Sequence, residues 1–158
     1  MLRAMKLSLY IDADACPVRE ECYKVAQRHN VAVIVVSNSF LRVPKYPFIS
    51  AVVVSDSFDA ADDYIAQRCN ADSVVITADI LLAERCLLAG ARVIAPSGKP
   101  FDNDSIGAAI ATRAIMADLR AGAEMPNLGG PAPFSARDRS RFLETLHVTI
   151  EQMKRTAR

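Results

Sequence analysis

Two aspartates stand where a short apolar run of the sequence stops. Asp12 and Asp14 follow the run from Leu7 to Ile11, and Pro17 comes three residues after Asp14. The run is typical of a buried strand in a parallel sheet, and a proline fits the first turn of a helix. Both carboxylates would then lie at the carboxyl end of a strand, where open α/β sheets bind their ligands. Because neighbouring negative charges repel, we expect Mg²⁺ or Mn²⁺, which prefer oxygen ligands, to lie between them.

Further aspartates follow later apolar runs. Asp59 and Asp62 are three residues apart and share one face of a predicted helix, and Asp79 follows another predicted strand. Right-handed crossovers bring the ends of consecutive parallel strands to one edge of a sheet. We therefore predict a metal site made by Asp12, Asp14, Asp59, Asp62 and Asp79, with all of them except Asp14 as catalytic residues. Such a site suits the cleavage of phosphodiesters.

A structural role is the alternative for single members of this set. Asp59 and Asp79 stand at predicted helix starts, where a carboxylate commonly caps the helix. Helix capping does not explain two aspartates, Asp12 and Asp14, at the end of a strand. The combination therefore favours a metal site over a collection of caps.

Several arginines are candidates for contacts with a nucleic-acid backbone. Arg137 and Arg141 are four residues apart on the last predicted helix and share a face. The predicted contact residues are Arg42, Arg113, Arg137, Arg139 and Arg141. The alternative for the last helix is a surface of salt bridges that involves Asp138 and Glu144.

The elements that must position these residues alternate between strands and helices. The predicted strands are 6–12, 32–36, 51–54, 73–77 and 92–95, and the predicted helices between them are 18–29, 59–69 and 80–89. Residues 37–47, between the second and third strands, are predicted to form a loop. Strands that alternate with helices are typical of an α/β protein with a parallel sheet covered on both faces. The handedness of the crossovers predicts the order 3-2-1-4-5, with the first strand central.

The rest of the chain is predicted to be mostly helical. Residues 96–100 are interpreted as a turn and 105–121 as a helix, and the proline- and glycine-rich residues 124–133 are predicted to be irregular. A last helix begins after Ser135, with Asp138 completing a capping box, and reaches about Met153. We expect one domain over 1–158, with 105–158 as a helical extension packed on it.

Composition excludes some classes of protein. The chain has no run of about 18 apolar residues that would span a membrane, and its 4 cysteines show no C-x-x-C spacing. We expect a cytoplasmic protein with reduced thiols, no disulfide and no membrane partner. The 2 histidines, His29 and His147, are predicted to lie on helix surfaces, and a zinc site is not expected.

Several motifs in a fixed order resemble those of the bacterial YaiI/YqxD family, whose function is unassigned. The motifs are Asp12-Ala-Asp-Ala-Cys-Pro17, Phe58-Asp59-Ala-Ala-Asp62, Ile76-Thr-Ala-Asp79-Ile, and Gly129-Gly-Pro131 with Pro133-Phe-Ser-Ala-Arg137-Asp-Arg139. The resemblance covers essentially the whole chain. The family is grouped with PIN-like domains, metal-dependent ribonucleases built on a central parallel sheet. The resemblance implies that Asp12, Asp59, Asp62 and Asp79 stand where those nucleases place their acidic residues.

These observations predict a PIN-like three-layer α/β/α protein that acts as a metal-dependent nuclease on RNA. A non-catalytic module that binds RNA or protein is the first alternative. A haloacid-dehalogenase-like phosphatase is the second, because Asp12 and Asp14 resemble the nucleophile and acid of that family. The order of motifs opposes this alternative, since the pair Asp62-Asp63 comes before Thr77 and no motif lysine is evident. The oligomeric state stays open.

Overall fold

The computed structural model describes residues 6–14, 16–57, 59–122 and 133–156. Its centre is a six-stranded sheet in the order β3-β2-β1-β4-β5-β6. The strands are β1 (Ser8–Asp12), β2 (Ala32–Ser37), β3 (Ile49–Val53), β4 (Ser73–Ile76), β5 (Arg92–Ile94) and β6 (Pro100–Phe101). The helices are α1 (Arg19–His29), α2 (Ala60–Arg68), α3 (Ile80–Leu88), α4 (Asn103–Ala121) and α5 (Ala136–Thr156).

The first five strands are parallel and confirm the predicted order, with β1 central. The sixth strand was not predicted. β6 pairs antiparallel with β5, with Pro100 opposite Ile94. β6 has only two residues, which is too short for a strand pattern to be visible in the sequence. One of them is a proline, which has no N–H and is tolerated at a sheet edge. The turn before β6 depends on Gly98, whose φ of +90° favours glycine.

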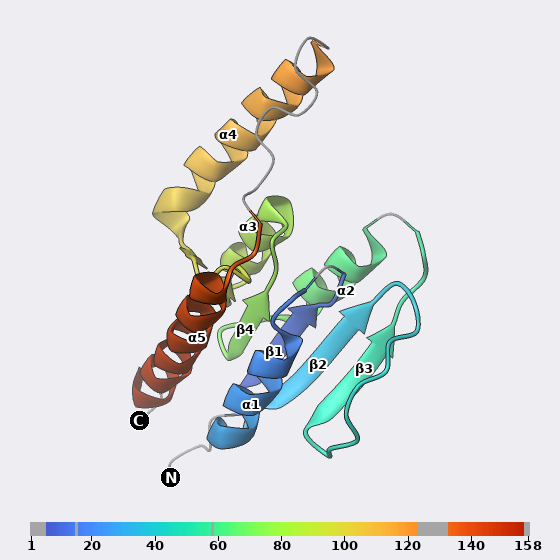
Figure 1. Cartoon of the computed structure of the whole chain (residues 1–158), viewed down its shortest axis with the longest axis vertical. Helices are drawn as coiled ribbons and strands as arrows, with labels where there is room; N and C mark the ends of the chain where they lie inside the picture. Colours follow the sequence, from blue (N-terminus) through green and yellow to red (C-terminus); the bar gives the residue numbers. More distant parts are fainter. Residues whose placement is uncertain (1–5, 15, 58, 123–132, 157–158) are drawn as a thin grey trace.

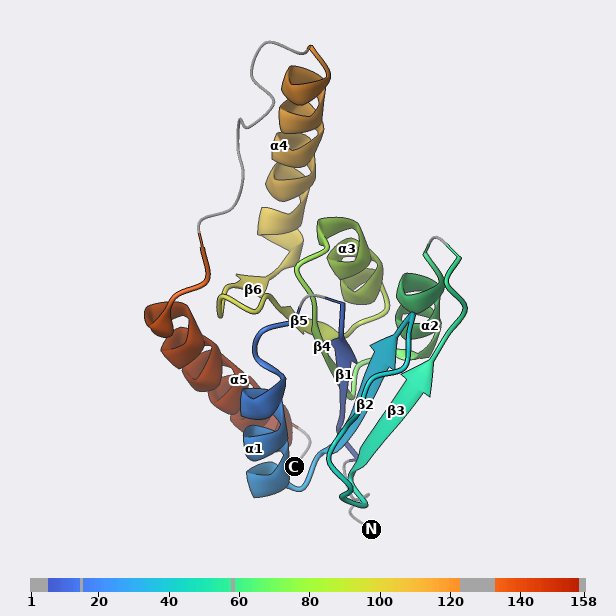
Figure 2. The same cartoon turned by 45° about the vertical axis from the view of Figure 1, so that its right-hand side comes forward.

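Helices cover both faces of the sheet and make three layers. Successive strand residues point to opposite faces, so Leu9 and Ile11 pack against α1 and α5, while Tyr10 packs on the side of α2 and α3. Figure 2 shows α1 and α5 on one side of the sheet and α2 and α3 on the other. The predicted three-layer α/β/α arrangement is therefore confirmed.

The two C-terminal helices differ in how they pack. Phe142, Leu146 and Ile150 recur every four residues along α5 and are fully buried, so this helix is part of the core. Ser135 and Asp138 exchange the hydrogen bonds of the predicted capping box at its start. By contrast, Ile106 is the one buried residue of α4, which rises away from the sheet beyond its carboxyl edge (Figures 1 and 2). The predicted irregular segment 124–133 lies, except for Pro133, outside the described residues.

A loop, not a helix, makes the crossover from β2 to β3, as predicted. Residues 38–48 run from the carboxyl end of β2 to the start of β3 at the opposite edge of the sheet (Figure 1). Leu41, Val43 and Phe48 anchor this crossover loop because they pack on the core shared with α1 and α5. In the part of the chain that the structure describes, no helix is long and apolar enough to cross a lipid bilayer.

Candidate functional site

A pocket of about 630 Å³ opens at the carboxyl ends of the parallel strands. Its lining includes all the aspartates predicted as ligands, which are Asp12, Asp14, Asp59, Asp62 and Asp79, and we call it the acidic pocket. These residues come from the end of β1, the turn after it, and the starts of α2 and α3. The fold thus brings together carboxylates that are up to 67 residues apart in sequence. Their role as metal ligands stays a prediction.

One buried threonine joins two of the strand ends. β1 and β4 are paired in register, with Ile11 opposite Ile76, so the next residues, Asp12 and Thr77, lie side by side. The Thr77 hydroxyl donates to Asp12 Oδ2 at 2.8 Å and accepts a hydrogen bond from the Asp79 backbone N–H at 3.0 Å. Thr77 is thus a positioning residue that the sequence reasoning did not single out. Its place directly after a strand and two residues before Asp79 was the available signal.

The two helix starts use their aspartates differently. Asp79 Oδ1 accepts from the backbone N–H groups of Leu81 and Leu82 at 2.9 and 3.3 Å, so the capping alternative holds for this oxygen. Asp59 occupies the N-cap of α2 with a φ of 69°, and its side chain makes no capping hydrogen bond. A positive φ is uncommon outside glycine, although aspartate tolerates it better than most residues. The Asp59 carboxylate therefore does not cap α2, although Asp59 stands at the N-terminus of that helix.

Crowding of negative charge changes the acidity of this pocket. Burial, together with the charges of Asp79, Asp12 and Asp59 and a hydrogen bond with Asp79, raises the pKa of Asp62 from 3.8 to about 6. Burial, together with the nearby charges of Asp14 and Asp79, also raises the pKa of Asp12, although the Thr77 hydrogen bond opposes this effect. Like charges that resist ionisation together favour a cation between them.

The donor atoms of the acidic pocket fit a hard cation. Carboxylate oxygens are the ligands that Mg²⁺ and Mn²⁺ prefer. Among the described residues, no three carboxylates of the acidic pocket bring a ligand oxygen each to within 4.8 Å of the other two. Two ligands bound directly to one Mg²⁺ lie about 3 Å apart in its octahedral shell, so the carboxylates would have to close in or bind through water.

The predicted arginines do not gather at one place. Arg113 of α4 lines the acidic pocket, whereas Arg42, Arg137 and Arg141 are exposed and are not among its lining residues. Arg139 forms a salt bridge with Glu21 of α1 and donates to the Pro17 carbonyl at 3.2 Å. The salt-bridge alternative thus holds for Arg139, with Glu21 as the partner in place of the acidic residues of its own helix.

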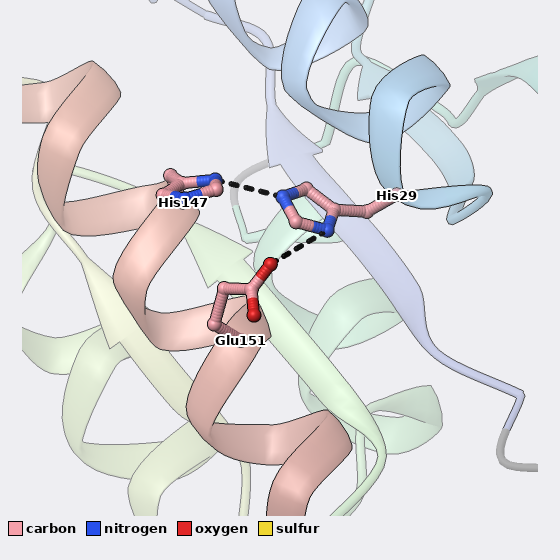
Figure 3. A group of neighbouring side chains, drawn as sticks. All are labelled: His29, His147 and Glu151. Atoms are coloured by element: carbon pink, nitrogen blue, oxygen red, sulfur yellow. Dashed lines mark hydrogen bonds and ion pairs between the residues drawn. The ribbon is translucent and has the colours of Figure 1, made fainter.

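The prediction that both histidines lie on helix surfaces was wrong for His29, which is buried between α1 and α5, whereas His147 is half-buried. His29 is only 7% exposed, and its Nε2 lies 2.8 Å from Nδ1 of His147 on α5 (Figure 3). Its Nδ1 lies 3.7 Å from Glu151 Oε1. Sequence separation concealed this contact, since α1 and α5 pack side by side in the fold.

This histidine group has ligand types that could hold a metal ion, because its three candidate ligand atoms lie within 4.8 Å of one another. A competing cation is already present. Lys154 Nζ donates to the His29 carbonyl oxygen at 2.7 Å and lies 3.4 Å from His29 Nδ1. Burial and the charge of Lys154 lower the pKa of His29. The His29–His147 hydrogen bond and the hydrogen bond from Lys154 to the His29 carbonyl also link α1 to α5.

Cys16, the cysteine at the acidic pocket, gives no sign of nucleophilic chemistry. All four cysteines, Cys16, Cys22, Cys69 and Cys86, are buried free thiols. Cys16 lines the acidic pocket, but burial raises the pKa of its thiol, which keeps the thiolate scarce. This agrees with a structural role for Cys16.

Comparison with known proteins identifies the family. Residues 10–152 match the model of the YaiI/YqxD family, which is described as a family of uncharacterised bacterial proteins. The chain belongs to the YaiI/YqxD family. A relative named UPF0178 protein from Sphingopyxis alaskensis is 63% identical over 147 residues, which cover 93% of this chain and 95% of the relative. A UPF0178 protein from Rhodopseudomonas palustris (strain HaA2) is 49% identical over 155 residues, covering 98% and 93%. A search of solved structures finds no significant match to this YaiI/YqxD chain.

Proposed function

We propose that this YaiI/YqxD protein is a PIN-like, metal-dependent nuclease that acts on RNA. The observation that carries the proposal is the acidic pocket, in which carboxylates from the end of β1, the turn after it and the starts of α2 and α3 meet at the carboxyl edge of the sheet. The raised pKa of Asp62 supports it, because burial and the neighbouring carboxylates both oppose ionisation of this group, and a bound cation would offset both effects.

The side chains of the pocket have distinct roles in this proposal. Asp12, Asp62 and Asp79 would hold Mg²⁺ or Mn²⁺, which would supply positive charge to a phosphodiester and make a water molecule more acidic. Thr77 fixes the orientation of Asp12 through its hydroxyl. The Asp59 carboxylate, which makes no capping hydrogen bond with α2, can orient a water molecule. Arg113 offers a guanidinium to a phosphate at the side of the pocket that α4 borders.

The phosphatase alternative gains nothing from the structure. A haloacid-dehalogenase-like site needs a lysine beside its aspartates, and the described residues that line the acidic pocket include Arg113 but no lysine. The remaining alternative is a module that binds RNA or protein without turnover. It keeps the same pocket and differs only in the absence of cleavage.

A paired cleavage and melting experiment tests the proposal. The wild-type protein is incubated with single-stranded RNA and DNA in Mg²⁺, Mn²⁺ or EDTA, and its melting temperature is measured in the same buffers. We expect metal-dependent cleavage of RNA, and stabilisation by the metal of about 2.7 kcal/mol at a hundredfold excess over the dissociation constant. Asp12→Asn should remove both effects.

A neighbouring aspartate outside the pocket gives the control. Asp63 pairs with Arg85 at 2.8 Å, so Asp63→Asn should keep cleavage and metal stabilisation. Equal metal-induced shifts in wild type and Asp12→Asn would contradict the site assignment. Metal binding with no cleavage of RNA or DNA would favour the binding module.

A further inference from the structure

The crossover loop between β2 and β3 exposes side chains that its own packing does not explain. Phe40 is 84% exposed and Tyr46 is 51% exposed, and Arg42 and Lys45, which lie between them in the sequence, are also exposed. We call these four residues the loop strip. A single exposed apolar residue is ordinary, but two aromatic rings interleaved with two cations in one short loop form a mixed surface.

Alternation along the loop sets the direction of these side chains. Leu41 and Val43 turn inward and pack against the core shared with α1 and α5. Phe40 and Arg42, the residues next to them, are exposed. The anchors therefore fix the backbone beneath the loop strip. At its other end, Tyr46 stacks on Phe48, which also packs against the core, with ring centroids 5.6 Å apart and planes at 29°.

The charge of the loop strip is opposite in sign to that of the acidic pocket. No aspartate or glutamate occurs between Ser37 and Ser55, so the two cations of the loop strip have no acidic neighbour in this stretch. The loop also begins at the pocket, because Asn38 lines it. A phosphodiester chain is repelled by a cluster of carboxylates, and an adjoining positive surface offsets that repulsion as the chain approaches.

We propose that the loop strip binds single-stranded RNA and leads it to the acidic pocket. Bases stack on Phe40 and on the Tyr46–Phe48 pair, and Arg42 and Lys45 contact the phosphates between them. Unpaired bases expose the faces that such stacking requires, whereas the bases of a duplex are already stacked on one another. The inference rests on the proposed nuclease function for its substrate class, but it concerns binding and can be tested without turnover.

Binding is measured by fluorescence anisotropy with labelled oligouridylate and oligoadenylate in EDTA, so that no cleavage occurs. Phe40→Ala should weaken binding about 5- to 150-fold, the range for loss of one stacked base. Arg42→Ala and Lys45→Ala should each weaken binding and reduce the slope of log affinity against log salt by about 0.7. Duplex RNA of the same length should bind more weakly than the single strand.

Matched controls exist elsewhere on the surface. Leu88 is 81% exposed at the far end of α3, so Leu88→Ala removes an equally exposed apolar side chain away from the loop. Arg155→Ala removes an exposed cation at the end of α5. Both controls should bind RNA like the wild type, and urea unfolding should show that every variant is folded.

The outcomes separate this inference from the proposed function. Weaker binding by Phe40→Ala and Arg42→Ala, with unchanged controls, supports the loop strip even if the wild type cleaves nothing. Wild-type binding that these substitutions leave unchanged overturns the loop strip, while metal-dependent cleavage would still support the nuclease. Absence of any binding to single-stranded RNA also overturns it and leaves a protein partner as the reading of this surface.

Discussion

Replacing Asp62 by asparagine should stabilise the metal-free protein. The pKa of Asp62 is raised from 3.8 to about 6 by burial and by its acidic neighbours. At pH 7.5 the ionised carboxylate therefore destabilises the folded state relative to the unfolded chain, where the same group ionises freely. A difference of about two pH units corresponds to about 3 kcal/mol. Because Asp62 is only half-buried and solvent screens its charge, we reduce this to about 1 kcal/mol.

The assay is thermal unfolding in EDTA at several pH values. For a chain of 158 residues, about 1 kcal/mol raises the melting temperature by about 2–4 °C. The sign follows from proton binding. A carboxyl with a raised pKa binds a proton more readily in the folded state, so the cost in the wild type disappears as the pH falls through about 6 toward 4. The advantage of Asp62→Asn should therefore be largest at pH 7.5 and vanish near pH 4.

Two results would refute this reasoning. One is a metal-free Asp62→Asn protein that melts at or below the wild-type temperature at pH 7.5, which would mean that burial and the neighbouring carboxylates do not make the ionised Asp62 unfavourable. The other is a gain of equal size at pH 4. The adjacent Asp63 is the control, because Asp63→Asn lies outside the acidic pocket and loses the ion pair with Arg85, so it should be neutral or slightly destabilised.

Three further predictions concern the framework around the site. Gly98→Ala should lower the free energy of unfolding, measured in urea, by about 2 kcal/mol or more, because φ is +90° and the added Cβ would lie 2.7 Å from the backbone of Arg141. Gly107 on α4 is the control, because it has open space around it, and Gly107→Ala should raise the free energy of unfolding by about 0.5–1 kcal/mol. Arg139→Ala should lower it by about 1–3 kcal/mol, because it leaves the Glu21 carboxylate, only 10% exposed, without its ion pair; stability unchanged in urea would show that the pair contributes nothing. Burial and the charge of Lys154 lower the pKa of His29 in the folded protein. The stability that neutral His29 contributes should therefore be complete above its ordinary pKa of 6.5 and be lost as the pH falls through its lower pKa in the folded state. An NMR titration that finds a pKa above 6.5 for His29 would contradict this.

Local sequence patterns were enough to predict the five parallel strands, their order and the convergence of the aspartates, but not the antiparallel edge strand β6. Each parallel strand is an apolar run, and Asp12, Asp59 and Asp79 end such a run or begin the next helix, with Asp14 and Asp62 two and three residues further on. Position along the chain therefore already indicates which sheet edge these residues reach. The handedness of crossovers then orders the strands without any knowledge of side-chain contacts. The sequence therefore determined where the carboxylates of the acidic pocket lie.

Only the tertiary structure decided which distant side chains are partners. His29 and His147 are 118 residues apart, and nothing in either local pattern indicates the other. The same holds for Arg139, which pairs with Glu21 on α1, and for Thr77, whose hydroxyl meets Asp12 because β1 and β4 are in register. Hydrophobic periodicity specifies which face of an element is buried, but the residue opposite that face depends on how whole helices and strands pack together.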